Sequence, residues 1–250
     1  MTLSTAAHAE WIKIRSTRSL VWSLIVVLAS TAGVTAQTCA TLGTSLKEPG
    51  FDPLFSSYSG LNFGQLAASV FAALAVAGEY RSGAIHTSLV AVPRRGMFYS
   101  AKLGVVAGLA LLVGLITSLA SFLAGQAFIR HENGALALGL GDPGALRAVF
   151  GCAVYFALVA VFSAGLAALL RSVVGALCVL VPLYLLVPFI FSQTADGPAV
   201  ADFLPDHAGR QILLQDPTGP GGAWGGTAIL AAWSAAAALA GWLALRSRDA

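Results

Sequence analysis

Side chains that could carry out catalysis or bind a metal are few and scattered along this sequence. The three cysteines are too few for a disulfide framework, and Cys152 and Cys178 lie within apolar runs. The sequence has no HExxH and no GxSxG motif. No two of the histidines have the spacing of metal ligands on one helix; they are His8, His86, His131 and His207. We therefore expect no catalytic residue and no metal site in this chain.

Nucleotide and nucleic-acid binding are also disfavoured. A Walker A element requires the pair Gly-Lys, which never occurs in the chain. We expect no cofactor in this chain. If its function requires ATP and Mg²⁺, a partner subunit would bind them. The formal charge of +3 is small and the basic residues are dispersed, which argues against a nucleic-acid partner.

Uncharged polar side chains remain, inside long apolar runs. Such groups usually form hydrogen bonds between packed helices, and this is our first interpretation. The alternative is that some of them line a substrate path, for which the candidates are Gln65, Ser69, Thr117 and Ser121. No Asp, Glu, Lys, Arg or His lies in these runs, which argues against an ion-driven carrier.

The elements that position these side chains follow from composition. Hydrophobic residues make up 57% of the chain and charged residues 10%, with a mean hydropathy of +0.81, whereas about 25% of the residues in a soluble domain are charged. Apolar runs of about 20 residues must be helices when lipid surrounds them. We predict an all-α, polytopic membrane protein forming one transmembrane domain, 1–250, with six spans at 19–38, 61–78, 103–129, 148–170, 173–192 and 224–245.

The distribution of charge predicts the orientation. Placing both termini in the cytoplasm puts ten Lys and Arg residues inside, whereas only Lys47, Arg130, Arg147 and Arg210 fall outside. We therefore expect a multi-pass protein of the cell membrane with outer loops at 39–60, 130–147 and 193–223. The one substantial cytoplasmic loop is then 79–102.

The N-terminal segment, 1–18, has the pattern of an interfacial helix. Leu3, Ala7, Trp11 and Ile14 fall on one helical stripe, and Glu10 and Lys13 point elsewhere. Trp11 would lie at the level of the lipid headgroups, and basic side chains would meet anionic lipid; these are Lys13, Arg15 and Arg18. A frayed polar tail and a cleaved signal peptide ending near Ala36 are the alternatives.

The cytoplasmic loop carries the most informative residues. It reads GEYRSGAIHTSLVAVPRRGMFYSAK over 78–102, with charges at both ends and a proline that would stop a short helix at Val90. Taken alone, this is a charged hairpin between two spans, to which a cytoplasmic partner could bind.

The loop, with GEYRSGAI followed by VPRRG, resembles the permease subunits of type-2 ATP-binding-cassette (ABC) exporters, particularly the short actinobacterial kind. Four further segments resemble those permeases in the same order along the chain: EWIKIRSTRS, GDPGALRAVFG, FLPDHAGRQIL and LRSRDA. The likeness covers nearly the whole chain, and its strength lies in order and spacing.

The resemblance implies roles for particular residues. The segment 79–90 would be the coupling helix that seats in a groove of the ATPase subunit, and 11–18 would be the connecting helix beside it. Short helices would dip back toward the membrane within 204–214. His86 and Thr87 depart from the usual loop pattern. The residues implied in coupling are Glu79, Tyr80, Arg81, Ser82, Gly83, Arg94 and Arg95.

The hypothesis that follows is a permease subunit without its own nucleotide site. It would form a translocation pathway with a second copy of itself or a sister permease, and couple to separate cytoplasmic ATPase subunits. A membrane-embedded docking or regulatory protein without transport activity is the alternative, and a proton-coupled drug carrier is a third hypothesis. Substrate identity stays open, and export rather than import is implied by the resemblance alone.

Overall fold

The chain is mostly helical in the part that the computed structural model describes, residues 3–41, 50–83, 95–132, 134–192, 200 and 202–247, and no strand occurs there. This confirms the all-α class. The helices are α1 Leu3–Ser16, α2 Arg18–Ala40, α3 Pro53–Ser56, α4 Leu61–Ser82, α6 Arg95–Glu132, α7 Ala145–Leu170, α8 Val173–Ser192, α10 Pro205–Arg210, the 3₁₀ turn η2 Gln211–Leu213, and α11 Gly222–Ser247.

Five of these helices are long and apolar enough to cross a membrane: α2, α4, α6, α7 and α11. Each contains one of the predicted spans, and the protein is accordingly a polytopic helical membrane protein. The remaining span was predicted at 173–192, and α8 has these bounds; the part of it whose side chains are described without a gap, Val173–Val187, is apolar. A sixth crossing and the side on which the termini lie stay predictions.

The predicted cytoplasmic loop is shorter than its expected 79–102. Helix α4 continues through Glu79 to Ser82 and ends at Gly83, whose φ of +71° is the left-handed conformation common after helix ends. Helix α6 begins at Arg95 and runs for 38 residues. The helices extend beyond the apolar runs because ion pairs satisfy the charges near their ends. Residues 84–94, which include most of the expected coupling helix and Arg94, lie outside the described residues.

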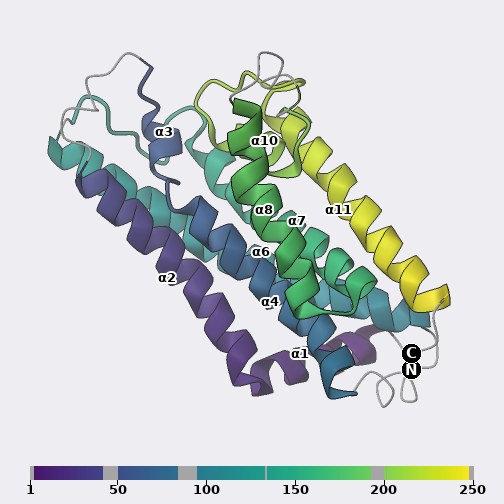
Figure 1. Ribbon diagram of the computed structural model, residues 1–250. Coiled ribbons are helices and arrows are strands. Elements are labelled where there is room, and N and C mark those ends of the chain that lie inside the picture. The colour runs from purple at the N-terminus through teal and green to yellow at the C-terminus, as the bar shows by residue number, and fades with distance from the viewer. Residues whose placement is uncertain are drawn as a thin grey trace.

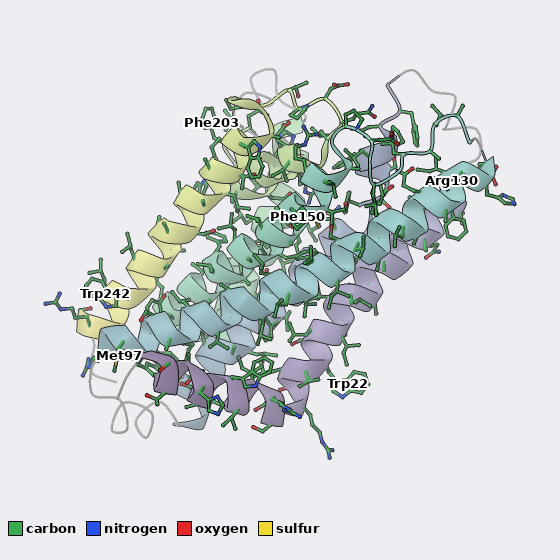
Figure 2. The ribbon with its side chains drawn as sticks, turned by 180° about the vertical axis from the view of Figure 1, so that it is seen from behind. Trp22, Met97, Arg130, Phe150, Phe203 and Trp242 are labelled. Atoms are coloured by element: carbon green, nitrogen blue, oxygen red, sulfur yellow. The ribbon has the colours of Figure 1, made fainter. Side chains whose placement is uncertain are left out.

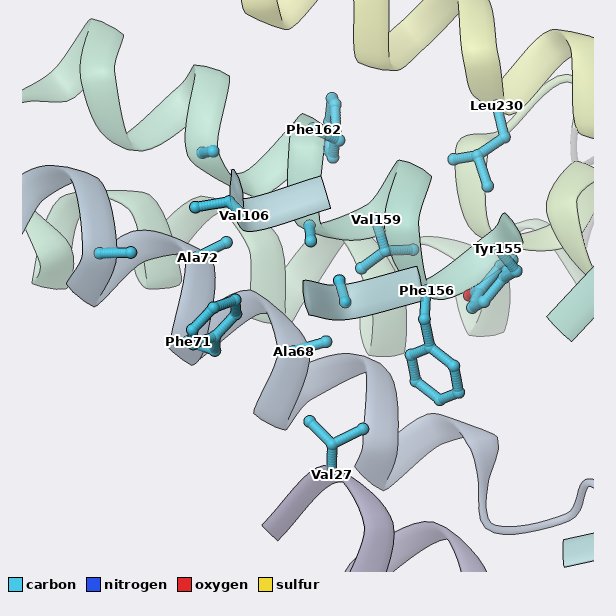
Figure 3. Packing of buried hydrophobic residues seen from close by; sticks show 14 of the residues in the cluster. Val27, Ala68, Phe71, Ala72, Val106, Tyr155, Phe156, Val159, Phe162 and Leu230 are labelled. Carbon is cyan, nitrogen blue, oxygen red and sulfur yellow. The ribbon is translucent and has the colours of Figure 1, made fainter. Parts of the chain in front are cut away.

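The long helices lie side by side, with α1 across one end of the bundle and α3 and α10 at the other (Figure 1). Helix α7 is central and packs on α11, α6 and α4. Small residues permit these contacts: a Cβ on Gly165 of α7 would lie 2.5 Å from the backbone of Ala237 in α11. Around α7 the core contains apolar side chains of α2, α4 and α6, among them Val27, Phe71 and Val106 (Figure 3).

The short helices expected within 204–214 are confirmed as α10 and η2. The N-terminal helix is also present, as α1, and its placement on the membrane surface stays a prediction. The buried face of α1 consists of Ala6, Glu10 and Ile14, whereas Trp11 is 42% exposed. Glu10 turns into the bundle because α6, on which α1 packs, provides a basic partner for it there.

Candidate functional site

Four charged side chains meet at the end of the bundle where α1 lies, and we call them the charge cluster: Glu10 and Lys13 of α1, Glu79 of α4 and Lys102 of α6. Lys102 Nζ donates to Glu10 Oε2 at 2.5 Å and to Glu79 Oε1 at 2.8 Å. Lys13 Nζ donates to Glu10 Oε1 at 2.8 Å and also to Glu79. The cluster thereby joins three helices through two carboxylates and two ammonium groups.

Burial distinguishes the members of the charge cluster. The side chain of Lys102 is 4% exposed and those of Glu10 and Glu79 are 7% and 8%, whereas that of Lys13 is 39% exposed. Burial alone would raise the pKa of the Glu10 carboxyl, but Lys102 and Lys13 outweigh it and hold that pKa below its ordinary value. Burial would likewise lower the pKa of Lys13, and the two carboxylates raise it instead.

Apart from Arg94, which lies outside the described residues, the residues implied in coupling lie around this same end, and those whose side chains are described make contacts within the chain. Glu79 belongs to the charge cluster. The guanidinium of Arg171, in the turn between α7 and α8, lies 5.3 Å from the ring of Tyr80. Arg95 Nη1 donates to the carbonyl of Leu245 in α11 at 3.0 Å. Gly83 ends α4, and nothing is described of the side chains of Arg81 and Ser82.

Of the residues predicted for the interfacial helix, Lys13 joins the charge cluster and three are exposed: Trp11, Arg15 and Arg18. Sequence reasoning missed Glu10 and Lys102 as site residues. Their only signal was that each is a charged residue beside a long apolar segment, which does not identify a partner 92 residues away.

A second polar group lies at the opposite end of the bundle, and we call it the cap cluster: Asn62 and Gln65 of α4, Tyr155 of α7, and Asp206 and Arg210 of α10. Asp206 Oδ1 accepts from Tyr155 Oη at 2.8 Å and from Arg210 Nε and Nη2 at 3.0 and 2.8 Å. Tyr155 Oη also contacts the side-chain amide of Gln65, and Arg210 donates to Asn62. These contacts fasten the short helix α10 onto α4 and α7.

Asp206 is a buried acid that sequence reasoning did not single out. It comes from the loop 193–223 rather than from an apolar run, and it is 3% exposed. The signal in the sequence was Pro205 at a helix start followed by Asp206 and Arg210 four residues apart. Burial would lower the pKa of Arg210, and Asp206 outweighs this and raises it.

The four candidate pathway residues are all fully buried inside one copy of the chain. They do not form one group. Gln65 belongs to the cap cluster, and Ser69 Oγ accepts from Ser163 Oγ of α7 at 3.0 Å. Thr117 and Ser121 lie on α6, and their hydroxyls have no hydrogen-bond partner among the described residues.

Within the described part of the chain, no three His, Cys, Asp or Glu side chains gather as metal ligands would. A scan of the sequence against protein-family models finds no match, and a search of curated proteins finds no significant relative. Function must therefore be argued from the charge cluster and the cap cluster, together with the helices that they join.

Proposed function

We propose that the chain is the membrane-spanning permease subunit of an ATP-driven ABC exporter. Two such subunits, identical or paired with a sister permease, would form the translocation pathway in the cell membrane with their termini in the cytoplasm. Separate ATPase subunits would bind ATP and Mg²⁺ and drive the change of access. The proposal rests on the sequence resemblance and on one structural observation.

That observation is the charge cluster, two of whose members, Glu79 and Lys102, flank the connecting segment 84–94 in the sequence. Glu79 lies five residues before this segment and Lys102 eight residues after it, and both are bonded to α1. A displacement of the segment would therefore be passed to α4, α6 and α1 together, since separating any of them would leave a charge buried without its partner. Such a mechanical connection is what coupling to an ATPase requires.

One observation favours the alternative of a docking or regulatory protein without transport activity. The four candidate pathway residues are buried within a single copy, so they support no open path through one chain. A docking protein needs only the connecting segment and the helices that hold it. The two hypotheses differ in whether binding of the partner changes ATP hydrolysis.

The test begins with affinity purification of the chain in mild detergent, with its native neighbours expressed, followed by mass spectrometry and an ATPase assay. The variant of choice is Arg94→Glu. Substitution of Glu79 would confuse coupling with folding, because Glu79 is buried in the charge cluster. We expect Arg94→Glu to reduce both the recovery of the ATPase subunit and the rate of hydrolysis.

The matched control is Arg130→Glu, which makes the same charge reversal at the exposed far end of α6. It should leave recovery and hydrolysis at the wild-type level. A copurified ATPase whose hydrolysis is unaffected by Arg94→Glu would favour the docking protein. Recovery of the chain without any ATPase subunit would refute the exporter.

A further inference from the structure

A groove of about 460 Å³ lies between α1 and α6, lined by a different face of α1 from the one that carries the charge cluster. Its wall on α1 includes His8 and Trp11, and its wall on α6 includes Gly108, Leu109 and Leu112. A Cβ on Gly108 would meet nothing within 4 Å, so the absence of a side chain there leaves the space open. Figure 2 shows the face of the molecule on which α1 crosses the first turns of α6.

The surroundings of the groove are apolar and continue along α6. Leu112 is 57% exposed, and further exposed apolar side chains follow it on the same helix, Ile116 and Leu123 among them. In a helix that crosses a membrane, such a face is covered by lipid chains. The groove is thus placed where the lipid-covered face of α6 meets a helix lying across the end of the bundle.

The face of α1 that lines the groove carries a positive charge one helical turn beyond the lining residues. Ser4, His8, Trp11 and Arg15 recur at intervals of four, three and four residues, which places them along one helix face. Arg15 is exposed on this face. The one acid of α1, Glu10, is buried on another face and paired with Lys102 and Lys13, so it does not offset the charge of Arg15.

We propose that this groove binds one anionic phospholipid. An acyl chain lies against Gly108 and Leu112, Trp11 contacts the interfacial region, and the phosphate-bearing headgroup faces Arg15 and His8. Shape and charge both support this occupant: the apolar floor fits a hydrocarbon chain, and basic side chains at a membrane surface attract anionic headgroups. The proposal is independent of whether the protein transports a solute.

The experiment uses the purified full-length chain, stripped of lipid in detergent and titrated with phosphatidylglycerol or phosphatidylcholine, with bound lipid counted by native mass spectrometry. We expect one phosphatidylglycerol to bind more tightly than phosphatidylcholine. Gly108→Leu should weaken that binding about tenfold, which corresponds to roughly two fewer buried methylene groups of the lipid. Arg15→Gln should weaken it about fivefold and reduce the preference for the anionic lipid.

Two matched controls separate this site from general lipid adhesion. Gly33→Leu adds the same bulk at an exposed glycine of α2, where a Cβ also meets nothing within 4 Å. Arg130→Gln removes an exposed charge in the last turn of α6, at the opposite end of that helix from the groove. Both controls should bind phosphatidylglycerol as the wild type does. Equal binding of the two lipids, or an unchanged affinity in Gly108→Leu, would overturn the proposal.

Discussion

The charge cluster and the cap cluster fasten opposite ends of the same bundle, but they do so with different chemistry. In the charge cluster, buried Lys102 bridges the two carboxylates of Glu10 and Glu79. In the cap cluster, one carboxylate, Asp206, is shared between Arg210 and the neutral hydroxyl of Tyr155. The first therefore depends on a balance of formal charge, and the second combines one ion pair with neutral hydrogen bonds.

This difference decides how each end responds to loss of one member. A buried charge that loses its partner has no water to replace it, and the cost exceeds that of a neutral hydrogen bond. The charge cluster should consequently tolerate little change in its net charge. The cap cluster should tolerate neutralisation of its acid better, because an amide oxygen can still accept from Tyr155 and Arg210.

The largest effect is expected for Lys102→Met. This substitution leaves Glu10 and Glu79 buried side by side with only the half-exposed Lys13 between them. We expect a loss of about 3–5 kcal/mol in the free energy of unfolding, measured by circular dichroism during titration with sodium dodecyl sulfate in mixed micelles.

Lys102→Met combined with Glu79→Gln is the matching test of charge balance. Removal of one acid together with the base should recover part of the lost stability. If the double variant is as unstable as Lys102→Met, or if Lys102→Met itself loses less than about 1 kcal/mol, then packing rather than charge holds this end together.

The next largest effect is expected at the cap cluster. Asp206→Asn removes the charge that Arg210 and Tyr155 share but keeps an acceptor of similar shape, so we expect a loss of about 2 kcal/mol in the same titration. Asp202→Asn is the control, because Asp202 lies four residues earlier and is partly exposed, 3.3 Å from His207. A loss at Asp206→Asn as large as that at Lys102→Met would remove the distinction between the two clusters.

The comparison also shows which features the sequence could predict. Apolar runs determine helices because backbone groups in lipid must bond within their own segment, and the bounds predicted for 61–78 and 173–192 lie within or match α4 and α8. Neither cluster could be assembled in this way. Glu10 and Lys102 are 92 residues apart, and Tyr155 and Asp206 are 51 apart, so helix packing, which periodicity does not determine, brings each pair together.

A smaller loss of stability is expected when the pH is lowered. The lowered pKa of Glu10 means that its charge stabilises the fold above its ordinary pKa of 4.5, and that this contribution is lost as pH falls through the lower value in the folded protein. Lys102 and Lys13 face this carboxyl directly, and Glu79 shares both of them. The midpoint of thermal unfolding in detergent should therefore fall more steeply below pH 4.5 in the wild type than in Glu10→Gln. Parallel curves for the two proteins down to pH 3 would contradict the assignment.

The smallest loss in the free energy of unfolding is expected for Lys13→Met. This variant tests whether a lysine stabilises the charge cluster through its burial or only through its pairing with the carboxylates. Lys13 contacts the same two carboxylates as Lys102, but its side chain is 39% exposed against 4% for Lys102. Both carboxylates keep their hydrogen bonds to Lys102 when Lys13 is lost, and Lys13 itself is partly solvated, so we expect a loss of about 0.5–1 kcal/mol in the detergent titration. Equal losses for Lys13→Met and Lys102→Met would show that the cluster responds to the number of its charges, whereas a severalfold difference would show that it depends on the one lysine buried between three helices.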